Sequence, residues 1–513
     1  MANNISNHKL IEAIKDIPID PNRVWGIYGT GDGAKIVYDL LCELEIDHAV
    51  KVFIDRDDRV NDNEKNCGLP VKRLSDVADS LNGIIIAAID NHTIISERIY
   101  NTLTEKQAAK ISIIDIFSYN TKKDRLEFAN YIENRIWKDE REFVAFDEAG
   151  YLRKEEDTKI ITWYLPQFHQ MEINNKFHGQ GFTEWTNTSK AIPLYTGHYQ
   201  PHIPYDVGYY DLLNPDTLRR QIYLAKHYGI YGFCFHYYWF SGTRIMEKPL
   251  ELLLKHKDLD MPFCLDWATE NWTALWDGGN NEIMLEQSLK AGDDQRFMDD
   301  ILPYFSDPRY IKIDGRPVLV IYRISMFDKE RAKNLLHNFR EIAKKNGFPD
   351  LYIMLTNSFD FDDDAAEWEA DAIVEFPPHT VRHLMDGYEV QGYLNPYFNG
   401  RILDPSSFIK NKKYMLKHAS AEYYRSALVS WDASARKATS KGFIMEGLNP
   451  KTFKTWLKDI MAESKQIHSA SNDIVFVNSW NEWAEGSHLE PDMKYGYAYL
   501  QAIKEVFEEL NAV

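Results

Sequence analysis

From Lys159 onward the sequence repeats one pattern, in which a short apolar run is followed in most intervals by a stretch with helical periodicity. Eight such runs occur, at residues 159–166, 230–239, 261–267, 316–323, 351–357, 371–376, 426–432 and 473–480. Eight buried strands that alternate with helices predict a (β/α)8 TIM-type barrel over residues 158–513. A doubly wound sheet is the alternative, but a single sheet with this many strands would have to be very wide or divided.

The residues before the predicted barrel show a shorter α/β pattern. A helical stretch at residues 32–44 lies between the first two of four strand-like runs, at residues 23–31, 49–55, 83–89 and 110–116. This alternation predicts a Rossmann-like parallel α/β domain over residues 1–118. Residues 119–157 are charged and helical in pattern, which predicts a helical connector between the two domains.

Charge and composition exclude several classes of partner. The net charge is −19, whereas nucleic acid and anionic membranes are bound by clustered Lys and Arg, so we expect no nucleic acid partner. The first residues lack a basic segment followed by an apolar core, and no apolar run reaches the ~18–20 residues of a membrane span. The four cysteines show no CxxC spacing. We therefore expect a reduced, cytoplasmic protein without a transmembrane segment.

The turn after the first strand-like run approximates a GxGxxG/A motif through Gly29, Gly31 and Ala34. Asp55 ends the second run, where dinucleotide-binding domains place a ribose-binding acid. The pattern favours a nucleotide held on the amides of a helix N-terminus, with Gly29, Gly31 and Asp55 as its binding residues. The alternative is that the glycines only permit a tight turn in a sheet that binds nothing. No Tyr-x-x-x-Lys pair follows, so a dehydrogenase is not expected.

In a barrel of this type, ligands bind where the strands end. These ends are rich in acids, amides, histidines and indoles, and a long loop at residues 179–204 adds further polar and aromatic side chains. Core packing alone does not select such a mixture. The residues predicted to bind substrate are His169, Glu184, Trp185, His236, Tyr237, Tyr238, Trp267, Glu270, Trp272, Glu375, Trp431, Asp432, Trp480, Asn481 and Trp483. The alternative is that the loop and the segment at residues 266–278 only cover the barrel.

Five histidines lie at strand ends or in the first long loop, namely His169, His178, His198, His202 and His236. None has the HxH or HExxH spacing of a metal site, although ligands from different strands would not show such spacing. Hydrogen bonding to substrate hydroxyl groups is the favoured interpretation, and no metal ligand is predicted.

The most specific candidate site follows the eighth run, in the sequence NEWAEG. Glu482 and Glu485 are three residues apart, so a turn or short helix would direct both carboxylates to one side. Paired carboxylates suit glycosidic chemistry, because one protonates the leaving group while the other acts as base or nucleophile. Their mutual repulsion favours retention of one proton. The alternative is a solvated acidic turn, which the neighbouring Trp480 and Trp483 disfavour.

Seven motifs follow one another within residues 158–505, in the order WYLPQFH, GFTEWTN, HYQPHIP, GFCFHYYWFSG, PFCLDWATENWT, EFPPH and NSWNEWAEGSHLEPD. Together they resemble the WbsX-type proteins, which are related to glycoside hydrolase family 99, the endo-α-mannosidases. The resemblance implies a (β/α)8 barrel that acts on carbohydrate in the synthesis of bacterial O-antigen, lipopolysaccharide or capsule.

The resemblance also implies roles for the two glutamates. In family 99 the second glutamate of an E-W-x-E motif is the general acid/base, and it matches Glu485. The first matches Glu482 and assists the substrate's own 2-hydroxyl group, which attacks the anomeric carbon to give a 1,2-anhydro sugar. Family tyrosines at strand ends hold the 2-hydroxyl region, and Tyr237 or Tyr238 would correspond to them. The chain reads AEGSH where the hydrolases read HEGT.

Three functional hypotheses follow. The first is a carbohydrate-active enzyme that cleaves or transfers a glycosidic bond of a bacterial oligosaccharide or polysaccharide with retention, and that requires no cofactor. The second is a sugar-nucleotide-dependent glycosyltransferase whose N-terminal domain holds the nucleotide. The third is a polysaccharide-binding protein without catalytic activity.

Overall fold

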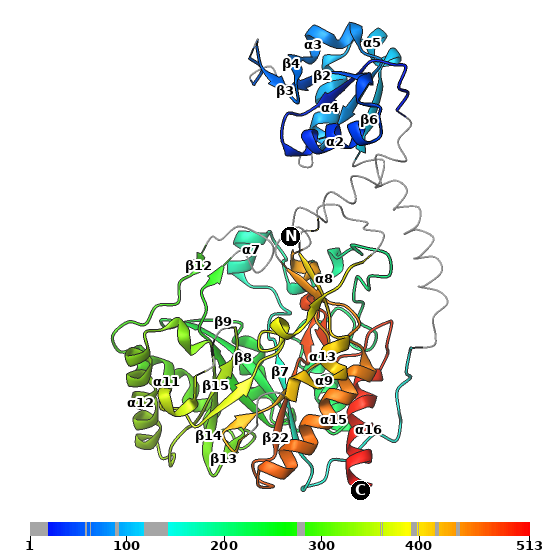
Figure 1. Cartoon of the computed structure of the whole chain (residues 1–513). Helices are drawn as coiled ribbons and strands as arrows, with labels where there is room; N and C mark the ends of the chain where they lie inside the picture. Colours follow the sequence, from blue (N-terminus) through cyan, green and yellow to red (C-terminus); the bar gives the residue numbers. More distant parts are fainter. Residues whose placement is uncertain are drawn as a thin grey trace. The chain divides into compact units, whose positions relative to one another are not determined.

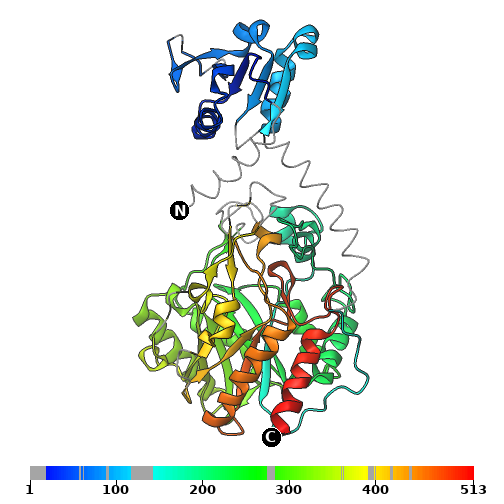
Figure 2. The same cartoon turned by 45° about the vertical axis from the view of Figure 1, so that its right-hand side comes forward.

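The computed structural model describes residues 19–56, 59–61, 63–87, 92–116, 142–273, 283–359, 361, 363–390, 398, 400–415, 420–437 and 442–512. The chain forms two compact units, which are described separately (Figures 1 and 2). The first contains a sheet within residues 25–115, and the regular structure of the second begins at Lys159.

A six-stranded sheet forms the centre of the first unit. Its strands are β1 (Trp25–Tyr28), β2 (Val50–Asp55), β3 (Lys65–Asn66), β4 (Leu69–Arg73), β5 (Gly83–Ile86) and β6 (Ser112–Asp115). They lie in the order β3-β4-β2-β1-β5-β6, and every neighbouring pair is parallel except β3 with β4. The α-helices among the described residues of this unit are α2 (Asp32–Glu43), α3 (Leu74–Val77), α4 (His92–Thr102) and α5 (Glu105–Lys110).

Side chains of these strands belong to two separate apolar clusters. Ile27 and Phe53 pack with Val37 of α2 in one cluster, whereas Ile54 packs with Ile99 of α4 in the other. Successive residues of a strand point to opposite faces, so α2 and α4 cover different faces of the sheet. A parallel sheet is normally covered in this way. The classification of this unit as Rossmann-like stays a prediction.

The predicted helical connector is described only in part. Residues 119–141 lie outside the described residues. Residues 142–157 contain turns and a bridge between Val144 and Gly496, and not the helix that the charge pattern predicted. Here the backbone groups of Val144 bond to Tyr495 and Tyr497, so these residues pair with another segment of the second unit instead of forming a helix.

Nine parallel strands form a nearly closed barrel in the second unit. They are β7 (Lys159–Tyr164), β8 (Gly232–Phe240), β10 (Phe263–Ala268), β14 (Arg316–Tyr322), β15 (Tyr352–Asn357), β16 (Ala372–Glu375), β19 (Tyr423–Tyr424), β20 (Ser426–Leu428) and β22 (Ile474–Asn478). Each pairs with the next as far as β19, and β22 pairs with both β20 and β7.

Only Arg425 separates β19 from β20, so eight chain segments run around this barrel. These segments overlap the eight runs that the sequence predicted as strands. The prediction of an α/β protein with a parallel barrel is therefore confirmed, and the arrangement is consistent with a TIM-type barrel.

Long helices surround the barrel, namely α9 (Pro215–His227), α10 (Lys248–Lys255), α11 (Asp293–Phe305), α12 (Lys329–Lys345), α15 (Pro450–Ile467) and α16 (Ala498–Asn511). Figure 1 shows α11 and α12 on one side of the strands and α15 and α16 on the other. The side chains of Asn214, Asp328 and Asn449 accept backbone N–H groups at the starts of α9, α12 and α15. In the described part of the chain, no helix has both the length and the apolar character needed to cross a membrane.

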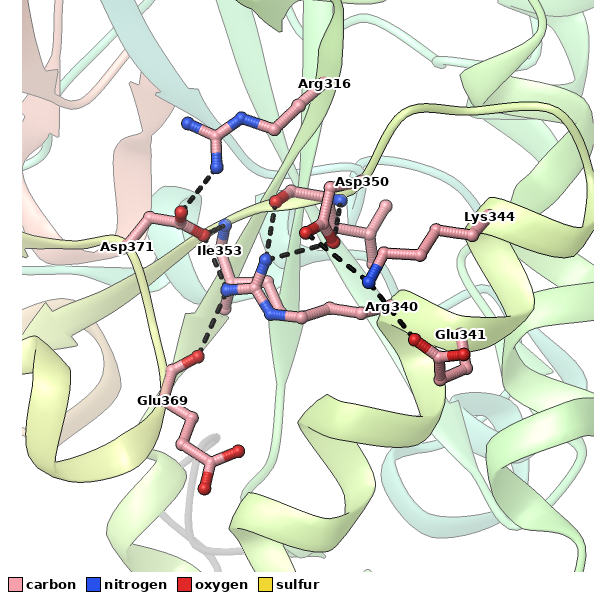
Figure 3. Close-up of polar contacts among 9 residues, drawn as sticks. Arg316, Arg340, Glu341, Lys344, Asp350, Ile353, Glu369 and Asp371 are labelled. Carbon is pink, nitrogen blue, oxygen red and sulfur yellow. Dashed lines mark hydrogen bonds and ion pairs between the residues drawn. The ribbon is translucent and has the colours of Figure 1, made fainter.

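An ion-pair network joins α12 to the starts of neighbouring barrel strands (Figure 3). Arg340 of α12 bonds Asp371, just before β16, with 2.6 Å between Nη2 and Oδ2. It also bonds Asp350, just before β15, with 3.2 Å between Nη1 and Oδ1. Arg316, the first residue of β14, bonds the other oxygen of Asp371 at 2.5 Å. Ligands of such barrels bind at the opposite ends of the strands, so we assign this network to stability.

The segments that follow the strands gather at one end of the barrel. The helix α7 (Glu172–His178) follows β7, and the short strand β12 (Ile283–Leu285) lies between β10 and α11. Figure 1 shows both at the same end, opposite to the C-terminal end of α16.

Candidate active site

A pocket opens where the barrel strands end. Of the residues predicted from the sequence, those that line it are Glu184, His236, Tyr238, Glu270, Trp272, Trp431, Glu482 and Glu485. Gln167, which follows β7, lies beside them. Tyr322, Arg382 and Arg436 also line the pocket, although no sequence pattern marked them.

Three carboxylates of the pocket converge on Arg436, from the short helix α14 (Ser434–Lys437). Its Nε lies 2.7 Å from Oε1 of Glu184, and its Nη2 lies 2.9 Å from Oε1 of Glu482. Its Nη1 lies 3.0 Å from Oε1 of Glu485. A guanidinium presents its donors in a rigid fork, so this one side chain fixes the relative positions of three acids. Sequence reasoning could have looked for such an arginine, because buried acids need a cation to offset their charge.

Glu482 is the most enclosed of the paired glutamates. Both of its carboxylate oxygens lie within 3.2 Å of Nε2 of Gln167, which donates to them. Burial raises the pKa of Glu482 well above its ordinary value, and the charge of Glu485 adds to this, although Arg436 opposes it. Burial and mutual repulsion therefore favour retention of one proton by the pair.

Asp432 fixes the turn that carries the two glutamates. Glu482 ends the short strand β23 (Asn481–Glu482), and Glu485 ends the helical turn η8 (Trp483–Glu485). The backbone N–H of Asp432 donates to the carbonyl of Glu485 at 2.7 Å. Its carboxylate Oδ2 lies 2.8 Å from His198 Nε2 and 2.6 Å from Gln200 Nε2. Asp432 thus connects the long first loop to η8 and is not itself among the lining residues.

Trp480 and Trp483 do not line the pocket, in contrast to the prediction. Their indole N–H groups donate to the buried carboxylate of Glu490, at 3.1 and 2.7 Å. Tyr210 and Gln221 donate to the same carboxylate, at 2.9 and 2.6 Å. Burial raises the pKa of Glu490 to about 7, although these four donors oppose the shift. The two tryptophans therefore hold a buried acid instead of facing a ligand.

Residues of β8 and β10 alternate between the pocket and the helix layer. His236 and Tyr238 line the pocket. Tyr237 and Trp267 instead pack on Phe297 of α11, with ring centroids 6.1 and 4.5 Å apart. Side chains of a strand point alternately to its two faces, so the two predicted residues that face α11 are part of the core.

Other predicted substrate residues also lie outside the pocket lining. The indole N–H of Trp185 donates to a backbone carbonyl at 2.8 Å. The Asn481 amide bonds both backbone groups of Leu165, at 2.8 and 3.0 Å, and so joins β23 to the end of β7. Glu375 accepts from Arg425 at 2.8 Å in a buried pair. These three side chains position the backbone around the pocket.

Two further acids contact the pocket, Asp266 through His236 and Glu270 as a lining residue. His236 Nδ1 lies 2.8 Å from Oδ2 of the fully buried Asp266 on the neighbouring strand. Glu270 forms an ion pair with Arg323. Trp272 meets Tyr238 edge to face, with ring centroids 5.3 Å apart. The wall therefore combines aromatic rings with a few polar groups, as small-molecule pockets commonly do.

His202, His488 and Asp492 form a buried cluster whose possible ligand atoms all lie within 4.8 Å of one another. His202 Nδ1 lies 2.8 Å from His488 Nε2, so one imidazole donates to the other. These residue types could also hold a divalent cation, whereas the sequence predicted no metal ligand. His169, predicted to bind substrate, lies outside both this cluster and the pocket lining, and burial lowers its pKa to about 4.

The predicted nucleotide-binding residues lie in the first unit, with Gly29 and Gly31 at the turn between β1 and α2 and Asp55 at the end of β2. Gly29 has a φ of +120°, which an L side chain rarely adopts, and Gly31 precedes the first residue of α2. The Asp55 carboxylate accepts the hydroxyl of Thr30 and the backbone N–H of Arg56. Asp55 is thus bonded to the turn that carries the two glycines and to its own neighbour, and a nucleotide at this turn stays a prediction.

The chain is similar to two uncharacterised proteins named WxcX from strains of Xanthomonas campestris pv. campestris. They are 34% and 33% identical to it over 355 residues, which is 67% of this chain and 49% of theirs. The chain therefore spans about half the length of the curated relatives that it matches.

The chain is also similar to two solved structures, at lower sequence identity. The endo-α-mannosidase of glycoside hydrolase family 99 from Bacteroides thetaiotaomicron is 14% identical, with a TM-score of 0.43 over 70% of this chain and 98% of its own. A glycoside hydrolase-like protein is 15% identical, with a TM-score of 0.44 over 72% of this chain and 98% of its own.

The family model described as glycosyltransferase WbsX matches residues 160–503. This match covers more than half of the chain and includes the barrel strands and both glutamates. The chain therefore belongs to the WbsX glycosyltransferase family, a family of carbohydrate-active enzymes.

Proposed function

We propose that the chain cleaves or transfers a glycosidic bond of a bacterial oligosaccharide or polysaccharide, with retention of configuration at the anomeric carbon. The observation that carries the proposal is the convergence of Glu482 and Glu485 on Arg436 in one pocket. Two carboxylates that reach one anomeric centre supply the acid and the base of glycosidic chemistry. Membership of a family named for glycosyl transfer supports a saccharide substrate.

Glu482 is assigned the role of base. Burial raises its pKa, which makes its carboxylate a stronger base, and Arg436 stabilises the carboxylate form that must accept the proton. It takes the proton of the substrate's 2-hydroxyl group as that oxygen attacks the anomeric carbon. The bond from this carbon to the glycosidic oxygen breaks in the same step, and its electron pair goes to the departing oxygen.

Glu485 is assigned the role of acid and then base. Its side chain is 13% exposed, against 8% for Glu482, which supports access to the departing group. It gives its proton to the glycosidic oxygen and then takes a proton from water or from an acceptor hydroxyl. That oxygen opens the 1,2-anhydro ring, and Glu482 returns the proton to the 2-oxygen. Two inversions at one carbon give net retention.

Leaving-group dependence tests this assignment. Wild type, Glu482→Gln and Glu485→Gln are assayed with matched glycosides that carry either a sugar or a dinitrophenyl leaving group. A dinitrophenolate departs without protonation, so Glu485→Gln should lose at least about a hundredfold more turnover on the sugar leaving group than on the activated one. Glu482→Gln should lose turnover on both, because the attack itself needs the base.

Glu367→Gln is the control, because this exposed glutamate is not among the lining residues of the pocket. It should match wild type on every substrate. Equal turnover in wild type and both active-site variants would contradict the assignment. Glycan binding without turnover in any protein would instead identify a binding protein.

A sugar-nucleotide-dependent glycosyltransferase is the second candidate, and the description of the family favours it. In that reaction the departing group is a nucleoside diphosphate, and the turn with Gly29 and Gly31 is a candidate site for the nucleotide. Calorimetry with UDP-, GDP- and dTDP-sugars tests this on wild type and Asp55→Asn. Binding of one nucleotide that is weakened in Asp55→Asn would support it, and lack of binding of all three would exclude it.

A further inference from the structure

One cation of the pocket has no acidic partner among the described residues. Arg382 lies at the start of the helical turn η6 (Arg382–Leu384), in the segment that follows β16. It lines the same pocket as Glu482 and Glu485. Its guanidinium carbon lies 5.5 Å from the ring centroid of Phe359 and 5.6 Å from that of Phe443.

The other arginines of this region are neutralised by acids. Arg436 is shared by three glutamates, and Arg323 is paired with Glu270. The Arg323 guanidinium also contacts the Phe359 ring, at 4.1 Å. Phe359 therefore lies beside two arginines. Arg323 is paired with an acid, whereas Arg382 has no acidic partner among the described residues.

The two aromatic contacts restrain Arg382. A guanidinium over aromatic rings retains its charge and its five donors, and it loses little further conformational freedom when it binds an anion. Trp431 lies on the same part of the wall, because its ring stacks on Phe443 with 5.7 Å between centroids. Its indole N–H makes no hydrogen bond with the described residues. Arginine and tryptophan side chains donate and cannot accept, so a ligand here must supply acceptors.

The pocket thus has two chemically different parts. The glutamates around Arg436 offer acceptors for sugar hydroxyl groups, whereas the part at Arg382 offers donors and an uncompensated positive charge. We propose that Arg382 is the centre of an anion subsite, and that the saccharide bound by this pocket carries a carboxylate or phosphate group that this subsite recognises. The inference rests on the proposed function, because it specifies the substrate class of the same pocket.

Two sources of the anionic group are distinguishable, namely a uronic acid or phosphorylated sugar residue and the diphosphate of a sugar nucleotide. Calorimetry on the full chain compares three probes in each hexose series: the neutral methyl glycoside, the corresponding uronic acid and the hexose phosphate. UDP- and GDP-hexoses form the fourth arm. The Glu485→Gln background prevents turnover, so binding is measured independently of catalysis.

Removal of the charge should lower the affinity for anionic probes. A charge-assisted hydrogen bond corresponds to a change in Kd of about tenfold to a hundredfold, so Arg382→Met should reduce the ratio of anionic to neutral affinity by this factor. Arg382→Lys should keep part of the ratio, because it retains the charge and loses the bidentate fork. The exposed Arg401→Met is the matched control and should leave the ratio unchanged. The thermal unfolding temperature of each variant establishes that it is folded.

Each outcome bears on the inference. A preference for uronic acids or hexose phosphates that Arg382→Met abolishes supports an anionic sugar residue, and a preference for nucleotide sugars alone supports the diphosphate. An anionic preference that is identical in wild type and Arg382→Met overturns the inference, as does tighter binding of neutral probes by wild type. Because these are binding ratios, an absence of turnover would contradict the proposed function without affecting this result.

Discussion

The Nη2 atom of Arg436 lies 2.9 Å from Oε1 of Glu482, in a pair whose two side chains are each at least nine-tenths buried. The same guanidinium also holds Glu184 and Glu485. Buried charges are tolerated when they are paired and hydrogen-bonded, and removal of one partner leaves the others uncompensated. The positive charge of Arg436 is therefore required for three acids to lie together in the pocket.

Arg436→Met should destabilise the protein by about 3–5 kcal/mol at pH 8, because it leaves buried carboxylates without their cation. Loss of the cation removes the interaction that lowers the pKa of Glu482 in the folded state, so this pKa rises further. The variant should therefore regain stability as the pH falls, when Glu482 takes up a proton. Urea unfolding of wild type and variant at pH 8 and pH 5 measures the two differences. Equal losses at both pH values would mean that lost packing, and not lost charge, is the cause.

The barrel was predictable because its strands are buried on both faces. Such strands appear in the sequence as continuous apolar runs. Two helix starts are also marked locally, because Asn214 and Asn449 are each followed by a proline. Glu482 and Glu485 were predictable because a strand end and a spacing of three residues are local features. These two glutamates line the pocket, although their roles stay a proposal.

The partners of these residues were not predictable, because they depend on packing between distant segments. Nothing local distinguishes Arg436, and its three acids come from two other parts of the chain. Trp480 and Trp483 lie beside the glutamates in sequence, but Glu490 determines where their indole groups point. Of Tyr237 and Tyr238, one faces the pocket, and the choice depends on how β8 is oriented in the barrel.

Glu490 should give the protein a specific dependence of stability on pH. Burial raises its pKa in the folded state to about 7, above the 4.5 expected in the unfolded chain. The folded state therefore binds the proton more tightly, and the stabilisation is complete below about pH 4.5 and is lost as the pH rises through about 7. The shift corresponds to a loss of up to about 3 kcal/mol.

Glu490→Gln cannot titrate, so the free energy of unfolding of wild type should fall relative to that of the variant between pH 4.5 and pH 8. The measurement is urea unfolding of both proteins across this range, followed by tryptophan fluorescence. A constant difference at all pH values would show that the pKa of Glu490 is the same in the folded and unfolded states.

Arg340 should matter for stability and not for ligand binding. Its guanidinium bonds Asp350, Asp371 and two backbone carbonyls, and its side chain is 15% exposed (Figure 3). Arg340→Met leaves these acceptors without their donor and should lower the free energy of unfolding by about 2–4 kcal/mol. Lys344→Met removes a 44% exposed partner of the same Asp350 and should cost less than about 1 kcal/mol. Thermal unfolding and glycan binding separate the two effects, and a change in Kd without a change in Tm would contradict the assignment.

Gly486 should be required for the position of Glu485. Its φ is +63°, and an added Cβ would lie 3.0 Å from the Asp432 Cβ and 3.2 Å from the Asp432 nitrogen. That nitrogen donates to the carbonyl of Glu485, so a shift that relieves the contact moves the proposed acid. Gly486→Ala should lower the free energy of unfolding by about 1–2 kcal/mol through the left-handed backbone alone, and the contact should lower it further. The same substitution should decrease kcat.

Gly447→Ala is the matched control for this prediction. Gly447 has a φ of +95°, and no atom lies within 4 Å of the added Cβ, so the substitution strains the backbone without displacing a neighbour. It should lower stability by the conformational cost and leave kcat unchanged. Stability from urea unfolding and kcat on the glycoside with a sugar leaving group are measured for both variants. If the two alanines lower kcat equally, the contact between Gly486 and Asp432 does not position Glu485.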